Sequence, residues 1–241
     1  MTFDDVEKRF EATLKDPQHQ AFLVAEEARR RSEMTRSLAL AKTRGIADAG
    51  IPRMFVEKVA GALEPTKALA EVGSTGDDLV VLAGVSGCGK TVAACAWLYR
   101  FLMQDSCYST RESLPVAAPR FIQPLFVTSA RLSRWDRYDG AAMASLLKAD
   151  RLVLDDLGNE YSDTKGNFLA ILDEVVADRA ANRRPTVVTT NLDAVAFKAR
   201  YGERIADRIR ESGRFVSLSG ASMRRVASLP EPPVEQKAGP W

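Results

Sequence analysis

Short apolar runs alternate with longer helical stretches through the central part of the chain. Five of these runs predict buried strands, at 79–83, 125–128, 152–155, 186–190 and 215–218. Neighbouring parallel strands need long crossover connections, and helices are the usual ones. The pattern therefore predicts an α/β fold, a parallel sheet with helices on both faces, in a core that extends from residue 79 to about residue 227.

A charged stretch without glycine precedes this core, at residues 2–44. Its apolar residues recur at nearly helical spacing, so we expect a small helical N-terminal arm over residues 1–49, broken near Asp16 and Pro17. Within the arm, residues 26–36 hold more arginine than glutamate. This segment is either a DNA-facing or partner-docking helix, or the solvated face of a helical arm.

Three further segments contain the glycine and proline residues that interrupt regular structure. Residues 50–78 predict a linker with one short helix. Residues 104–124 form a long connection with three prolines, which we expect to be a mobile surface insertion. Residues 228–241 hold four prolines and few core-forming residues, and predict a disordered tail.

Composition narrows the class of protein. The chain has 241 residues, 46% of them hydrophobic, which is enough for one substantial core and a small appendage. A formal net charge of +2 means that affinity for nucleic acid would have to come from local clusters. No stretch reaches the length of a membrane span and the first residues lack a secretory pattern, so we expect a cytoplasmic protein without a membrane partner. Three cysteines without a CxxC pair and a single histidine argue against a zinc site.

The first predicted strand leads into the sequence GVSGCGKT, and an apolar, alanine-rich helix is expected after it. Such a glycine-rich loop folds around phosphates with its backbone N–H groups pointing inward, while its lysine reaches the β- and γ-phosphates and its threonine ligates Mg²⁺. The positive end of the helix dipole adds to this attraction. The loop therefore predicts a nucleotide site made by Gly84, Ser86, Gly87, Cys88, Gly89, Lys90, Thr91 and Val92.

Polar residues end two of the later strands. Asp155 and Asp156 follow the run at 152–154 and look like a Walker B element, in which Asp155 holds Mg²⁺ and Asp156 polarises the attacking water. A strand that ends in a helix-capping aspartate is the structural alternative. Asn191 follows the strand at 186–190, where it could orient the lytic water or touch the γ-phosphate.

These motifs occur in order with the segment YGERIADRIR at 201–210, and together they resemble the AAA+ ATPases of the DnaC/DnaI helicase-loader and IstB group. The resemblance implies ATP and Mg²⁺ as cofactors, and a homo-oligomer, ring or spiral, with ATP at subunit interfaces. It assigns the arginine that reaches a neighbouring subunit's site to Arg208, with Arg204 in reserve. It assigns the arginine that senses the γ-phosphate within one subunit to Arg224, with Arg225 as rival. It also implies that the helical lid domain of other AAA+ proteins is absent.

The resemblance leaves two main functions open. The favoured one is a replicative helicase loader that binds single-stranded DNA and grips a helicase with its arm, with slow hydrolysis because Asp156 is shorter than the more usual glutamate. The alternative is a transposition regulator that assembles on double-stranded DNA and activates a transposase. A P-loop small-molecule kinase and a non-catalytic ATP-binding adaptor are more distant possibilities. Candidate DNA contacts are Arg131, Arg134, Trp135 and Lys165, although Trp135 could equally anchor its helix to the core.

Overall fold

A five-stranded parallel sheet forms the centre of the computed structural model, which describes residues 16–73, 78–111, 114–119, 123–135, 138–160 and 166–219. Its strands lie in the order β4-β5-β6-β1-β7. The predicted α/β fold is confirmed, although β5 and β7 are longer than the apolar runs suggested. The bounds are β1 Leu79–Gly84, β4 Leu125–Thr128, β5 Leu152–Leu157, β6 Thr186–Thr190 and β7 Gly213–Leu218.

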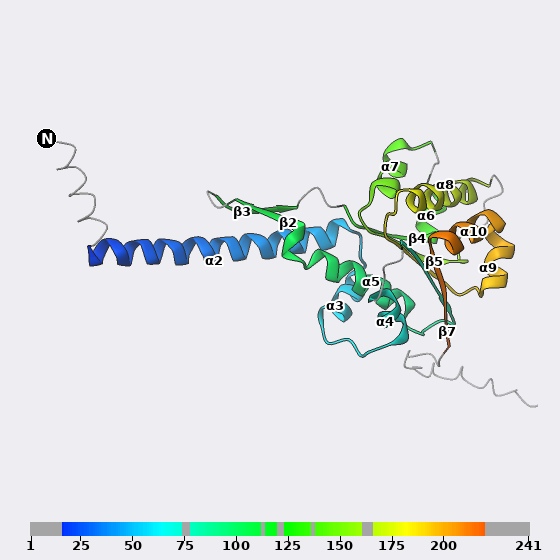
Figure 1. Ribbon diagram of the computed structural model, residues 1–241, viewed down its shortest axis with the longest axis horizontal. Helices are drawn as coiled ribbons and strands as arrows, with labels where there is room; N and C mark the ends of the chain where they lie inside the picture. Colours follow the sequence, from blue (N-terminus) through cyan, green and yellow to red (C-terminus); the bar gives the residue numbers. More distant parts are fainter. Residues whose placement is uncertain are drawn as a thin grey trace, which may run out of the picture.

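Successive residues of each strand point to opposite faces of the sheet, and two apolar cores result. On β1, Leu79 and Val81 belong to one core, whereas Val80 and Leu82 belong to the other. Figure 1 shows a separate group of helices on each face. The first core is covered by α6 Ser129–Leu132, α7 Gly140–Lys148, α8 Asn167–Ala181, α9 Ala194–Tyr201 and α10 Glu203–Ser212, and the second by α3 Arg53–Ala60, α4 Lys67–Gly73 and α5 Lys90–Leu102.

The strand order sets the geometry of the candidate site. The loop after β1 and the acidic residues of β5 lie at the same edge of the sheet, because the strands are parallel. They are not on adjacent strands, since β6 lies between them. Two strand spacings amount to roughly 9.5 Å, so side chains have to span this gap. Side chains of β6 do so, and the Thr91 hydroxyl of α5 also bonds to Asp155.

The described part of the arm is one long helix, α2, from Pro17 to Asp48. The predicted break is the point where this helix begins: the Asp16 side chain accepts a hydrogen bond from the amide of Gln18, and Pro17 occupies the first turn, where its missing N–H costs nothing. Residues 1–15 lie outside the described residues. The helix ends at Asp48, within the arm expected over residues 1–49, and it continues through Gly45, where the glycine-free stretch ends.

Close packing explains the continuation through Gly45. A side-chain carbon at this position would lie 3.1 Å from the Tyr108 hydroxyl oxygen and 3.3 Å from the Leu102 side chain. The glycine therefore allows α2 to approach α5, and this gain in packing outweighs its low helix propensity. The C-terminal half of α2 also packs through Met34, Leu38 and Ala41 against the start of a β-hairpin.

That hairpin corrects the prediction for residues 104–124. The described part is regular structure and not only a connection, because it forms a 3₁₀ turn, η1 Asp105–Cys107, and two antiparallel strands, β2 Tyr108–Arg111 and β3 Leu114–Pro119. The hairpin runs alongside α2 (Figure 1). Proline is tolerated because a two-stranded ribbon leaves both strands with an unpaired edge.

Residues 50–78 also differ from the prediction, because they form two helices, α3 and α4, instead of one. Val59, Ala68 and Val72 are buried in the second core, so both helices belong to the sheet's cover and not to a free linker. The predicted tail and the end of the core after Ser219 lie outside the described residues.

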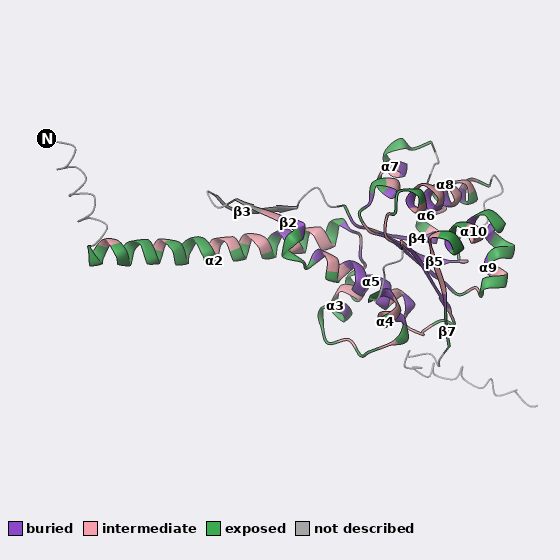
Figure 2. Ribbon diagram, in the orientation of Figure 1, coloured by how far each residue is buried: buried purple, intermediate pink, exposed green. Residues whose placement is uncertain are grey.

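The N-terminal half of α2 is exposed along most of its length (Figure 2). Three consecutive apolar residues near its start, Phe22, Leu23 and Val24, are 64%, 43% and 66% exposed. Among the helices described, none combines the length and apolar character needed to cross a bilayer.

Candidate nucleotide-binding site

The loop between β1 and α5 has the backbone that a phosphate cradle requires. Gly87 and Gly89 both adopt φ 89°, in the left-handed region that glycine enters without strain. Gly89 is the last residue before α5, so the free N–H groups of the first turn point into the loop. All the predicted loop residues lie together here: Gly84, Ser86, Gly87, Cys88, Gly89, Lys90, Thr91 and Val92.

Lys90 begins α5, and its side chain is buried, with the residue only 6% exposed. Its ammonium donates hydrogen bonds to the carbonyl oxygens of Gly84, at 2.6 Å, and Val85, at 2.9 Å. A third bond, at 3.0 Å, goes to the side-chain oxygen of Asn191 at the end of β6. The lysine and the asparagine, predicted separately from the sequence, are therefore in direct contact.

Asp155 is buried at the end of β5, with 6% of the residue exposed. The Thr189 hydroxyl donates to its Oδ1 at 2.7 Å. Burial raises the pKa of the Asp155 carboxyl, and the charge of Asp156 adds to this; hydrogen bonds from Thr189 and Thr91 and the charge of Lys90 oppose the shift without cancelling it.

The donor set beside the loop fits magnesium. A carboxylate and the Thr91 hydroxyl are the hard oxygen ligands that Mg²⁺ selects, and a single carboxylate suits an ion that keeps waters and binds phosphate oxygens. Within the described residues there is no cluster of three or more histidine, cysteine or acidic side chains that could enclose a metal by itself.

Asp156 has φ 63°, a conformation that residues with side chains seldom adopt. Hydrogen bonds hold both its backbone N–H and its backbone carbonyl group. Its N–H donates to the Thr189 hydroxyl at 2.9 Å, and its carbonyl oxygen accepts from the Ser129 hydroxyl at 2.6 Å. Its carboxylate accepts from the Asn191 amide at 3.3 Å.

Lys90, Asp155, Asp156 and Asn191 thus meet at one edge of the sheet, as the motifs predicted. Sequence reasoning missed Thr189 and Ser129, whose hydroxyls join these groups. A signal existed for Thr189, because a central strand with three buried threonines needs hydrogen-bond partners for their hydroxyls. Which partners they find depends on strand order, which the motifs do not specify.

A small apolar slot opens next to the phosphate loop. It has a volume of about 130 Å³ and lies between the segment before α4 and the start of α5. Leu63, Leu69 and Val92 supply much of its lining, with Gly89 at the edge shared with the loop. The slot offers a flat, apolar group a place beside bound phosphates.

The two arginines considered for contact with a neighbouring subunit lie on α10. Arg204 and Arg208 are four residues apart and therefore share a face of the helix. Their side chains are 71% and 45% exposed, and they pair with Asp173 on α8 and Glu211 on α10, each at 3.3 Å. Arg224 and Arg225, the candidates for the sensing arginine, lie outside the described residues.

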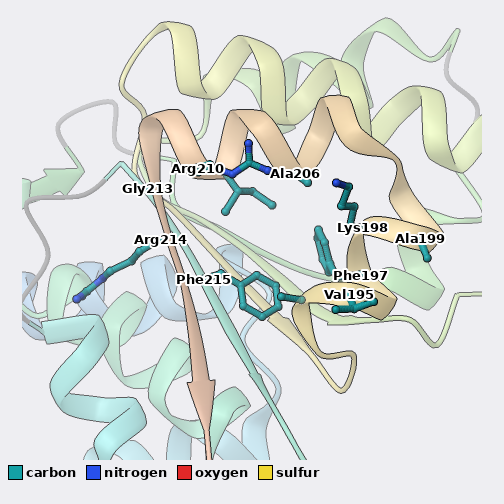
Figure 3. A pocket seen from close by; sticks show the side chains of 11 residues that line it. Val195, Phe197, Lys198, Ala199, Ala206, Arg210, Gly213, Arg214 and Phe215 are labelled. Carbon is teal, nitrogen blue, oxygen red and sulfur yellow. The ribbon is translucent and has the colours of Figure 1, made fainter.

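A second cavity lies away from the phosphate loop, as a groove of about 690 Å³ between α9, α10 and β7. Figure 3 shows Val195, Phe197 and Phe215 along it, with Lys198 and Arg210 also at the groove. On α10 its lining residues are Ala206, Ile209 and Arg210, which lie on a different face from Arg204 and Arg208. The groove is therefore not part of the nucleotide site.

The candidate DNA contacts lie around α6, which begins at the carboxyl end of β4. Arg131 and Arg134 are exposed, and the Arg131 guanidinium is 6.0 Å from the centre of the Trp135 ring. Trp135 packs against the first core and its carbonyl accepts from Asn167 at 3.2 Å. Trp135 thus packs against the core, and Arg131 and Arg134 beside it stay candidate DNA contacts. Lys165 lies outside the described residues.

The arginine-rich segment of the arm, residues 26–36, forms ion pairs within its own helix. Arg29 pairs with Glu26 and Glu33, Arg30 pairs with Glu26, and Arg31 pairs with Glu27, all within α2 at helical spacings of three or four residues. These pairs are those of a solvated helix face, which neutralises most of its own charge. The pairs fit a solvated helix face, and a docking role for this segment stays a prediction.

Comparisons with known proteins identify the family to which the chain belongs. A family model described as IstB-like ATP binding protein matches residues 23–229. A Sinorhizobium fredii protein, whose name describes it as an insertion sequence ATP-binding protein, is 31% identical to this chain over 153 residues. The match covers 61% of this chain and 57% of that one. The uncharacterised protein YdaV of Escherichia coli K12 is 32% identical over 168 residues, 68% of this chain and 62% of that one.

The chain therefore spans about three fifths of the length of these relatives. Among solved structures, the DnaC helicase loader superposes with a TM-score of 0.53 at 17% identity, and the match covers 70% of this chain and 100% of that chain. At an identity this low, the superposition shows a shared fold and nothing more.

Proposed function

Because the chain belongs to the IstB-like family of ATP-binding proteins, we propose that it is a DNA-associated AAA+ ATPase that hydrolyses ATP slowly at the loop after β1. One observation carries the proposal. Lys90, Asn191 and Asp156 form a continuous hydrogen-bonded chain from the phosphate loop to the acidic pair. The groups that bind phosphate and the groups that would activate water are thereby held in one arrangement.

Each residue has a separate task in this proposal. Lys90 and the N–H groups at the start of α5 bind the phosphates, and Thr91 and Asp155 hold Mg²⁺, which when bound neutralises charge on the β- and γ-phosphates. Asp156 accepts a proton from the attacking water, and Asn191 orients that water. The apolar slot lined by Leu63, Leu69 and Val92 takes the base.

Arg208 completes the site from a second copy of the chain. An arginine supplied by a neighbour stabilises charge on the transferring phosphoryl group and makes hydrolysis depend on assembly. It lies on an outer helix face and, within the described residues, is paired only with a nearby exposed glutamate, which leaves it available for this contact. Arg204 on the same face is the alternative.

The biological setting we propose is transposition on double-stranded DNA, with the arm binding a transposase. The support is the family match and the naming of the Sinorhizobium relative. Replicative helicase loading on single-stranded DNA, which the sequence motifs favoured, is the second candidate; its support is the fold shared with the DnaC loader. Both settings place the protein in the cytoplasm, where DNA and ATP are available.

ATP binding and phosphate release, measured with and without DNA over a range of protein concentrations, test the enzymatic part. We expect turnover per chain to rise with concentration and Lys90→Ala to weaken ATP binding by about 100-fold, because a charged hydrogen bond contributes up to roughly 3 kcal/mol. Lys148→Ala, at an exposed position on α7, is the matched control. Turnover independent of concentration, combined with transfer to a small acceptor, would instead indicate a kinase. ATP binding without phosphate release would indicate an adaptor.

A partner assay separates the two settings. Deleting the arm up to Gly45 would remove Met34, Leu38 and Ala41 from the core, so substitutions at the exposed apolar tip are the cleaner test. We expect the triple change Phe22→Ser, Leu23→Ser and Val24→Ser to abolish capture of a transposase from the same genome. Met54→Ser, at another exposed apolar position, should leave capture intact. Capture of the replicative helicase and not the transposase would establish the loader.

A further inference from the structure

The hydroxyl group of Thr189 is bonded to both members of the acidic pair. It donates to the Asp155 carboxylate at 2.7 Å and accepts from the Asp156 amide at 2.9 Å. We propose that Thr189 is a positioning residue for ATP hydrolysis, which sets the two carboxylates relative to each other and to the phosphate loop. This inference rests on the proposed function.

The strand order explains why a residue of β6 can do this. β6 lies between β1, which leads into the phosphate loop, and β5, which ends in the acidic pair. The regular register between β5 and β6 breaks between Leu154 and Leu157, which are the residues that flank the acidic pair. An irregularity at this point lets two consecutive aspartates turn toward the same crevice, which a regular strand would not allow.

Thr189 bonds to the polar groups that this irregularity leaves without strand partners. Asp156 adopts φ 63°, so its N–H cannot continue the normal ladder with β6. The Thr189 hydroxyl accepts that N–H and, with its own hydrogen, fixes the neighbouring carboxylate. One side chain thereby joins the backbone conformation of Asp156 to the orientation of Asp155.

The side chain is unusual for its place in the strand. Thr189 is 1% exposed in the middle of a parallel sheet, where valine has the same shape and needs no hydrogen-bond partner. Thr190 offers a direct comparison on the same strand, being fully buried as well. Its hydroxyl donates to the Leu157 carbonyl and accepts from the Leu192 amide, so it bonds to backbone and touches neither carboxylate.

The test compares Thr189→Val with Thr190→Val, which remove one buried hydroxyl each from the same strand. ATP affinity, the rate of hydrolysis at saturating ATP and the Mg²⁺ concentration for half-maximal rate are measured on the full chain, with thermal unfolding to establish folding. For Thr189→Val we expect a rate lower by about 10- to 100-fold and a raised Mg²⁺ requirement, with ATP affinity within about twofold of wild type. Thr190→Val should keep the wild-type rate and Mg²⁺ requirement.

Thr189→Ser retains the hydroxyl and should restore most of the rate. Wild-type kinetics in Thr189→Val would overturn the inference, and so would an equal loss in Thr190→Val, because the effect would then come from strand packing. If the wild-type chain itself releases no phosphate, the proposed function fails and this inference falls with it. A wild-type chain that hydrolyses ATP, beside a Thr189→Val variant that does so equally well, overturns the positioning role alone.

Discussion

Asp156 combines an uncommon backbone conformation with the position of the water-activating group. The left-handed conformation at φ 63° is tolerated better by asparagine and aspartate than by most other residues with side chains. Asp156→Asn therefore keeps the backbone and the shape while it removes the base. We expect hydrolysis to fall by about 100-fold or more with ATP binding unchanged, since a positioned general base contributes roughly 10²–10⁴-fold.

Asp139→Asn is the matched control for this change, because Asp139 caps α7 and asparagine caps a helix equally well. Steady-state phosphate release with both variants decides the point, and undiminished release by Asp156→Asn would assign water activation to another group.

The sequence could predict Asp156 from its motif but not its backbone conformation, nor the Ser129 and Thr189 hydroxyls that stabilise it. Those contacts depend on a break in strand register that no local pattern records.

Glu160 joins two elements next to the site, the turn after β5 and helix α9. Its side chain is 6% exposed and accepts from Arg200 at 2.7 Å, from the Tyr201 hydroxyl at 3.0 Å and from the Gly158 amide at 2.8 Å. Burial raises the pKa of the Glu160 carboxyl, but a hydrogen bond from its own backbone amide, together with those from Arg200, Gly158 and Tyr201, outweighs burial and holds the pKa below its ordinary 4.5. The charged form is therefore favoured by folding.

The stability that Glu160 contributes is thus present above pH 4.5 and is lost as the pH falls through the lower pKa of the folded state. We expect Glu160→Gln to lower the free energy of unfolding by about 1–3 kcal/mol at neutral pH, and the difference from wild type to shrink in acid. Urea unfolding at a series of pH values measures this. Glu203→Gln, at an exposed ion pair with Lys198, should change the free energy of unfolding little. If the difference between Glu160→Gln and wild type were the same at every pH, the loss of stability would come from packing and not from charge.

The prediction of elements succeeded where burial on both faces of the sheet produces continuous apolar runs, and it failed where distant segments meet. The apolar runs were sufficient for all five strands of the sheet. The β2–β3 hairpin was not predicted, because its stability depends on α2, some 70 residues earlier, running alongside it. The extension of α2 through Gly45 likewise depends on contact with Leu102 and Tyr108.

At the scale of the whole molecule, the described part of one chain holds the phosphate loop and the acidic pair, while its exposed arginines on α10 pair only with carboxylates of α8 and α10. A site shared between subunits makes a prediction that a self-sufficient site does not. At an ATP concentration that saturates wild type only, Lys90→Ala should be inactive because its ATP affinity is about 100-fold lower. Arg208→Ala should be inactive because it cannot complete its neighbour's site. The Lys90→Ala variant keeps the intact arginine, and the Arg208→Ala variant keeps the lysine that binds ATP.

Mixing the two inactive proteins should therefore restore part of the wild-type rate of phosphate release. In a mixed assembly, an Arg208→Ala subunit binds ATP and a Lys90→Ala subunit next to it supplies the intact arginine. Repeating the mixture with Arg204→Ala in place of Arg208→Ala identifies which arginine crosses the interface. The variant of the crossing arginine should be inactive alone and should regain activity in the mixture, whereas the other variant should not show both properties. A mixture that stays inactive, from two variants that are each folded and still assemble, would mean that Arg208 acts within its own chain or not at all.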